Sequence, residues 1–291
     1  MPATPSSNVA DALARMEHLA KGGPAASTPP NAGTKGGPRA VPAGYFALTR
    51  TATYGFLAAL PLFVLYEVLV RVTDGGTGVR VGADVWVKAL LAQAGVAGTL
   101  PLAIAVVVFG VALVLVERRR YGPLPVRASY VGGIVGEGLV YAVVVAVAVS
   151  SAVGALFAFG APLGAEGGAA VAAQAGGYAP GTASGLVLSL GAGLYEEFVF
   201  RVILVGGLAW LGRLVMRKRG AAYAVAAVVG ALVFSAVHYI GPLGDAFALP
   251  SFTFRFLFGL ALNALYLTRG FGVAAWAHAL YDVLVTLHIF G

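Results

Sequence analysis

Residues 184–211 read SGLVLSLGAGLYEEFVFRVILVGGLAWL, an apolar stretch interrupted by only three charges, Glu196, Glu197 and Arg201. About 20 helical residues cross the roughly 30 Å hydrocarbon core of a bilayer, so this stretch is long enough to span it. A crossing segment must satisfy its own backbone hydrogen bonds in lipid, so we expect a helix. Charges inside such a helix are costly and mark a functional site by default.

The composition of the whole chain extends this interpretation. Hydrophobic residues make up 59% of 291 positions, charged residues make up 11%, and the mean hydropathy is +0.87. A water-soluble fold cannot cover its surface with so little charge. We therefore predict an all-α, polytopic transmembrane bundle of about seven to eight spans. The expected spans are residues 52–71, 100–117, 130–157, 184–211, 221–240, 251–268 and 271–290.

The remaining segments differ in character. Residues 1–44 are rich in Pro, Ala, Gly and Ser, and we expect a disordered cytoplasmic arm there. Residues 45–183 then hold the N-terminal transmembrane helices, and residues 184–291 hold the segment that carries the chemistry. Segment 84–98 is either an interfacial helix or part of an eighth span, and Gly/Ala-rich residues 161–182 are expected to form an exposed loop.

The basic residues predict the orientation in the membrane. They gather in alternate loops, which places these loops and the N-terminus in the cytoplasm. The loop at 72–99 disagrees, because Arg80 and Lys88 lie in it. The Ala/Gly/Val bias favours a bacterial inner membrane, and the net charge of +7 is explained by topology rather than by nucleic acid. The basic residues of the alternate loops are Lys35, Arg39, Arg50, Arg118, Arg119, Arg120, Arg127, Arg213, Arg217, Lys218, Arg219 and Arg269.

The charges of the fourth span differ in their expected partners. Glu197 and Arg201 are four residues apart, so they share a helix face and can form an ion pair. Glu196 is rotated from Glu197 by about 100° and is not neutralised by that pair. It is therefore available as a general base. The alternative is an ion-pair network that only ties helices together.

Two histidines in later spans complete a candidate site. His238 ends the fifth span, four residues after Phe234, and His278 shares a helix face with Asp282 in the last span. One Glu and two His from three helices can position a water for attack on a carbonyl. They can do so as a base with hydrogen-bond donors, or as a His₂Glu zinc site made of Glu196, His238 and His278. The absence of Cys excludes thiolate catalysis and cysteine-ligated zinc.

These motifs, Glu196-Glu197-x-x-x-Arg201, Phe234-x-x-x-His238 and His278-x-x-x-Asp282, resemble those of the CPBP family of intramembrane proteases. That family includes the type II CAAX prenyl endopeptidases, the Abi proteins and the bacteriocin-immunity-associated proteins. The resemblance covers roughly residues 184–290. It implies a membrane endopeptidase in which Glu196 activates water, while His238 and His278 bind the scissile carbonyl.

The same resemblance gives supporting roles to Glu197 and Arg201, which hold the site together. Asp282 stands where eukaryotic relatives usually carry Asn, and an ionised Asp cannot donate a hydrogen bond to an oxyanion. The implied partner is a protein or peptide substrate in the membrane, such as a prenylated CAAX tail, a leader peptide or a sorting tail. Two alternatives are a catalytically silent scaffold or immunity factor, and a proton-coupled transporter with a Glu/His relay.

The predicted depths of the two histidines conflict. At ~1.5 Å per residue, His238 lies ~25 Å from the cytoplasmic end of its span, and His278 lies ~10 Å from that end. They meet only if these span boundaries are wrong or if the turn at 268–270 lies below the membrane surface. Four other polar groups are expected to be structural: Glu67 pairs with Arg71, Glu137 lacks a partner and faces the cavity, Arg255 snorkels, and Asn263 bridges two helices.

Overall fold

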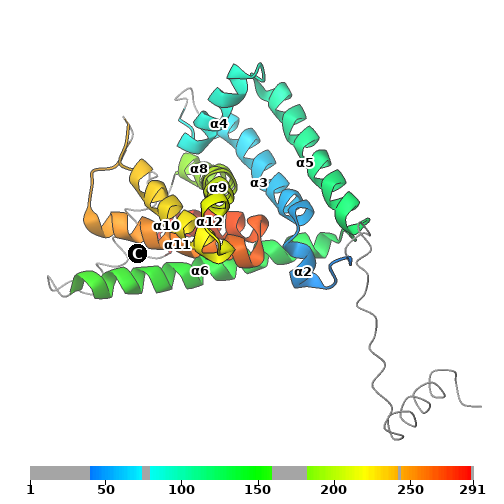
Figure 1. Cartoon of the computed structure of the whole chain (residues 1–291). Coiled ribbons are helices and arrows are strands. Elements are labelled where there is room, and N and C mark those ends of the chain that lie inside the picture. The colour runs from blue at the N-terminus through cyan, green and yellow to red at the C-terminus, as the bar shows by residue number, and fades with distance from the viewer. Residues whose placement is uncertain (1–39, 74–78, 159–181, 242–243, 290–291) are drawn as a thin grey trace, which may run out of the picture. The chain divides into compact units, whose positions relative to one another are not determined.

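The computed structural model describes residues 40–73, 79–158, 182–241 and 244–289 (Figure 1). Within these ranges the regular structure is helical, and they contain no strand. The elements are α2 (Tyr45–Thr49), α3 (Ala52–Thr73), α4 (Gly82–Gln93), α5 (Thr99–Tyr121), α6 (Ala128–Ala158), α8 (Ala183–Gly191), η1 (Ala192–Glu196), η2 (Phe198–Val205), α9 (Gly206–Val215), α10 (Arg219–Val237), α11 (Leu249–Arg269) and α12 (Phe271–Thr286).

The prediction of an all-α polytopic membrane protein is confirmed. Among the described residues, six helical stretches are long and apolar enough to cross a membrane, and α12 is a shorter apolar helix. The fourth of these stretches, Ala183–Val215, joins α8, η1, η2 and α9. Helix α4 has 12 residues. At 1.5 Å per residue it is about 18 Å long, too short to cross alone. The expected arm lies outside the described residues up to residue 39, as does the expected loop from 161 to 181.

Helix α12 forms the centre of the bundle. It packs against α6, α8, α3, α11 and η1, and the long helix α6 runs beside it (Figure 1). Its first half is fully enclosed, since Val273, Ala274 and Ala275 have no exposed surface. Small residues let the neighbours approach closely, as is common where membrane helices pack. A Cβ on Gly138 of α6 would lie 2.7 Å from the Cβ of Trp276.

The turn between α11 and α12 packs against α2. Gly270 adopts φ 89°, a conformation that favours glycine, and a Cβ there would lie 3.2 Å from the Cα of Arg50. Arg269 is 7% exposed and donates two hydrogen bonds of 2.7 Å to the carboxylate of Glu137. Tyr45 of α2 donates to the same carboxylate at 2.9 Å. Arg269 thereby ties the start of α12 to α2 and α6.

The expectation that Glu137 lacks a partner and faces the cavity was therefore wrong. Its cation comes from a residue 132 positions later, which helix spacing cannot reveal. Two of the other three structural expectations are confirmed. Glu67 pairs with Arg71 at 3.1 Å, and the side-chain amide of Asn263 donates to the carbonyl of Ala227 at 2.9 Å, joining α11 to α10.

The Arg269–Glu137 pair predicts the cost of opening the buried turn. Replacement of Arg269 by Ala leaves the Glu137 carboxylate largely buried without its cation, which costs about 3 kcal/mol. We expect the unfolding midpoint of the purified protein in detergent to fall by about 5–10 °C. The matched control is Arg217→Ala, at an exposed position. Equal midpoints for the two variants would show that the Arg269–Glu137 pair does not stabilise the protein.

Candidate active site

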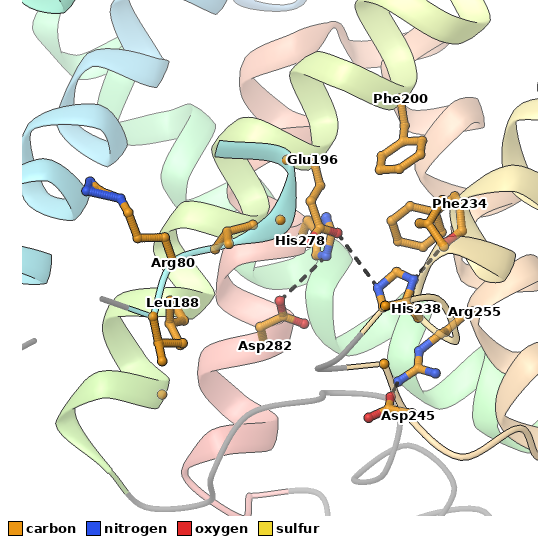
Figure 2. A pocket seen from close by; sticks show the side chains of 18 of the residues that line it. Arg80, Leu188, Glu196, Phe200, Phe234, His238, Asp245, Arg255, His278 and Asp282 are labelled. Carbon is orange, nitrogen blue, oxygen red and sulfur yellow. Dashed lines mark hydrogen bonds and ion pairs between the residues drawn. The ribbon is translucent and has the colours of Figure 1, made fainter. Parts of the chain in front are cut away.

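A cavity of about 910 Å³ opens between the helices that carry the three sequence motifs (Figure 2). Its size lies in the upper part of the range for ligand-binding pockets. The wall combines apolar side chains with a small set of ionisable ones. The ionisable and aromatic residues named in Figure 2 are Arg80, Glu196, Phe200, Phe234, His238, Asp245, Arg255, His278 and Asp282.

Glu196 and His238 face each other at the cavity (Figure 2). Their Oε2 and Nε2 atoms are 3.9 Å apart, and their side chains are 12% and 23% exposed. The Nδ1 of His238 is 2.7 Å from the carbonyl oxygen of Phe234. A carbonyl only accepts, so Nδ1 carries the proton of the neutral ring and Nε2 is left as an acceptor. A water in the cavity can therefore contact both Glu196 and His238.

Glu197 points away from the cavity into the protein and has no exposed surface. Its Oε1 atom is 3.0 Å from Nη1 of Arg201, as the four-residue spacing predicted. The same oxygen is 2.7 Å from Nδ1 of His278. One buried carboxylate thus joins the fourth span to α12 and fixes the orientation of the His278 ring.

Asp282 lies at the other edge of the same imidazole. Its Oδ2 atom is 3.6 Å from Nε2 of His278, which is beyond the usual hydrogen-bond range. The carboxylate that holds His278 at hydrogen-bond distance is therefore Glu197. Asp282 contributes negative charge beside the ring and lines the cavity.

The ring of Phe234 contacts Arg201 and both histidines of the site. The Arg201 guanidinium carbon lies 4.6 Å from the centre of this ring, within the range of a cation–π contact. The same ring packs edge-on against His238 at 5.0 Å and His278 at 5.9 Å. Phe234 thereby supports both imidazoles, which gives the motif position a physical role.

The backbone that presents the two glutamates is not a regular α-helix. Segments η1 and η2 are π-helical on either side of Glu197. Wider π turns inside α-helices are rare and frequently occur at functional sites. Gly193 of η1 lies directly on α12, where a Cβ would be 2.5 Å from the carbonyl oxygen of Ala275. Tyr195, two residues further along η1, donates to Glu67 of α3 at 3.0 Å, so η1 is held against both α12 and α3.

Arg255 was not predicted to belong to the site. It is 2% exposed, lines the cavity and pairs with Asp245, so the expectation that it snorkels was wrong. Its guanidinium carbon also lies 5.0 Å from the ring centre of Tyr239, just after His238. The backbone N–H of Asp245 donates to the carbonyl of His238 at 2.9 Å. The acidic residue that follows His238 in the loop was the only sequence signal for this pairing.

A zinc site would require Glu196, His238 and His278 to converge on one point. Among the described residues, no group of three or more His, Asp or Glu side chains is arranged so that it could hold a metal ion. The Nδ1 of His278 is held by Glu197, so its Nε2, on the side of Asp282, is the ring nitrogen that remains as a possible zinc ligand.

The arrangement so far defines a class: an integral membrane protein with a cavity in its helical bundle that is lined by carboxylates and imidazoles. Residues 178–284 match the family model described as "Type II CAAX prenyl endopeptidase Rce1-like". The matched segment contains all three motifs, and the match supports the predicted membership of the CPBP intramembrane proteases. The family indicates a membrane endopeptidase acting on a peptide substrate. No curated protein and no solved structure matches the chain.

The close contact at Gly193 predicts how sensitive the site is to helix spacing. Gly193→Ala forces η1 away from α12, so it separates Glu197 from His278 and costs about 1–3 kcal/mol. We expect a lower unfolding midpoint in detergent and a loss of most peptidase activity. The control is Gly207→Ala, since a Cβ at Gly207 meets nothing within 4 Å. An unchanged Gly193→Ala protein would show that this contact does not set the site geometry.

Proposed function

We propose that the chain is an intramembrane endopeptidase in which Glu196 activates a water for attack on a peptide bond. The observation that carries this proposal is the placement of Glu196 3.9 Å from His238 at the cavity. The ring of His278, which Glu197 holds in one orientation, lines the same cavity. A purely structural ion pair would be expected inside the protein, as Glu197 and Arg201 are. Glu196 instead lies at the cavity, and among the residues that the structure describes its ion-pair partner is His238, if that ring is protonated.

The geometry favours a division of labour between the two histidines. The Nδ1–H of His238 is directed at the Phe234 carbonyl, so its Nε2 accepts one hydrogen of the water while Glu196 accepts the other. This differs from the role implied by the family resemblance, in which both histidines bind the carbonyl. His278 lies between the carboxylates of Glu197 and Asp282, so it is the better placed of the two to carry positive charge.

The reaction then follows from these positions. Glu196 takes a proton as the water oxygen bonds to the carbonyl carbon. The negative charge that develops on the carbonyl oxygen is stabilised by the protonated His278 through its Nε2–H. Collapse of this tetrahedral intermediate breaks the C–N bond, and the proton held by Glu196 passes to the leaving amine. All protons are balanced by these side chains and the water.

The direct test is a comparison of cells that express the wild type and Glu196→Gln. Loss of a general base lowers the rate by roughly 10²–10⁴-fold. New termini of membrane and exported proteins, read by mass spectrometry, are expected with the wild type and absent with the variant. Glu117→Gln is the matched control, because Glu117 caps the start of α3 through the backbone N–H groups of Ala52 and Thr53. Identical termini with a stably inserted Glu196→Gln protein would favour the silent scaffold or the transporter.

A second test separates the metal-free mechanism from the zinc alternative. We expect the purified enzyme to keep its full rate after dialysis against a strong zinc chelator, because proton transfer relies on Glu196 alone. The measurement is cleavage of a peptide that spans one of the mapped termini, before and after dialysis. A loss of activity that added Zn²⁺ restores would assign Glu196, His238 and His278 as zinc ligands instead.

A further inference from the structure

The residues that line the cavity come from the same end of the spans. Helix α3 contributes its C-terminal end, α8 its N-terminal end, and α12 its C-terminal half. The loop after α10 and the start of α11 complete the wall with Asp245 and Arg255. Residues 79–83, at and just before the start of α4, also line the cavity.

The opposite ends of the spans carry the arginine-rich loops, and contacts show that these loops lie together. The Arg50 guanidinium donates to the carbonyl of Leu267 at 3.2 Å. Tyr54 donates to the carbonyl of Pro125 at 2.9 Å, which brings in the loop before α6. The loop before α10 is at this end as well, since Tyr223 donates to the carbonyl of Asn263 at 2.7 Å. The loops with Arg118–Arg120, Arg127, Arg213–Arg219 and Arg269 therefore share the end that is remote from the cavity.

Arg80 and Lys88 disagreed with the orientation predicted from sequence. These two cations and Arg255, which all lie near the cavity, are paired with carboxylates. Arg80 pairs with Asp84 at 2.7 Å, and Lys88 pairs with Glu67 at 2.5 Å. Arg255 pairs with Asp245. These side chains are held in place by the protein, whereas the side chains of Arg118, Arg119 and Arg120 at the other end are not buried.

Short loops with an excess of Lys and Arg stay in the cytoplasm. We therefore propose that the cavity opens on the extracytoplasmic face of the membrane, so that its substrates are exported proteins. This inference rests on the proposed peptidase function and names the substrate class of that same site. A cavity on the cytoplasmic face would have the arginine-rich loops at its mouth.

The rim of the cavity indicates which part of an exported protein is bound. Val79, Trp86 and Ile240 line the cavity and are 43%, 50% and 71% exposed. Apolar side chains at the rim suit an apolar peptide segment that emerges from the bilayer. The expected substrate is thus the membrane-proximal, extracytoplasmic segment of a membrane-anchored or newly exported protein.

The orientation can be tested without any substrate, because the chain contains no Cys. Single cysteines are introduced at Val79 and Phe247 near the cavity, and at Ala128 and Ala221 at the arginine-rich end; all four positions are exposed. Intact cells, or spheroplasts for a cell with an outer membrane, are treated with a membrane-impermeant maleimide. We expect labelling of Val79→Cys and Phe247→Cys within minutes, and labelling of Ala128→Cys and Ala221→Cys only after the membrane is permeabilised.

The reverse pattern would overturn the inference and place the cavity in the cytoplasm. Labelling in detergent confirms that each cysteine is reactive, and the same four variants in a Glu196→Gln background should give the same pattern. The result is therefore independent of peptidase activity. Separately, the termini that depend on Glu196 should map to extracytoplasmic segments. Absence of such termini with the expected labelling would refute the peptidase but not the orientation, whereas termini confined to cytoplasmic segments would refute the substrate class.

Discussion

The site depends on the contacts that the buried Glu197 carboxylate makes with Arg201 and His278. An unpaired charge inside a membrane protein is costly, so Glu197 must be matched by Arg201 and by the proton of His278. Because Arg201 is on the same helical stretch and His278 is on α12, this requirement fixes the position of one helix against the other. Phe234 then packs against Arg201 and both imidazoles, and so holds α10 in register with the other two.

This constraint also explains why α12 is short and enclosed. Its imidazole reaches a carboxylate in the middle of the fourth span, and the helix starts from a turn that packs against α2. The ion pair of Arg269 with Glu137 stabilises that turn, and the glycines at positions 138 and 193 let the neighbouring helices approach. The start of α12 is thus held by close packing, while its C-terminal half lines the cavity.

The sequence predicted those features that depend on local spacing. Apolar runs give the spans, since a helix must satisfy its backbone in lipid, and the four-residue spacing gives the Glu197–Arg201 pair. The three motifs also predicted which side chains would meet, and the structure places Glu196, His238 and His278 around one cavity. The different surroundings of the adjacent glutamates followed from the rotation of about 100° per residue.

Features that depend on distant contacts were not predictable in this way. The partners of Glu137 and Arg255 are set by how helices and loops pack, so these two residues were misassigned. The π-helical backbone around Glu197 has no signal in residue spacing, because the same side chains fit an α-helical pattern. The contact of His278 with Glu197 was also not predictable. Asp282 lies four residues after His278, so helix spacing pointed to this local partner and not to a carboxylate on another helix.

Glu196 and His238 are proposed to act on the same water, and a double-mutant cycle can show whether they do. Single-turnover cleavage of one mapped peptide is measured for the wild type, Glu196→Gln, His238→Ala and the double variant. Residues that act as one unit are strongly non-additive. Our account predicts that the double variant is no slower than the slower single variant. A rate loss equal to the product of the two single losses would show that the two residues act independently, which contradicts the account.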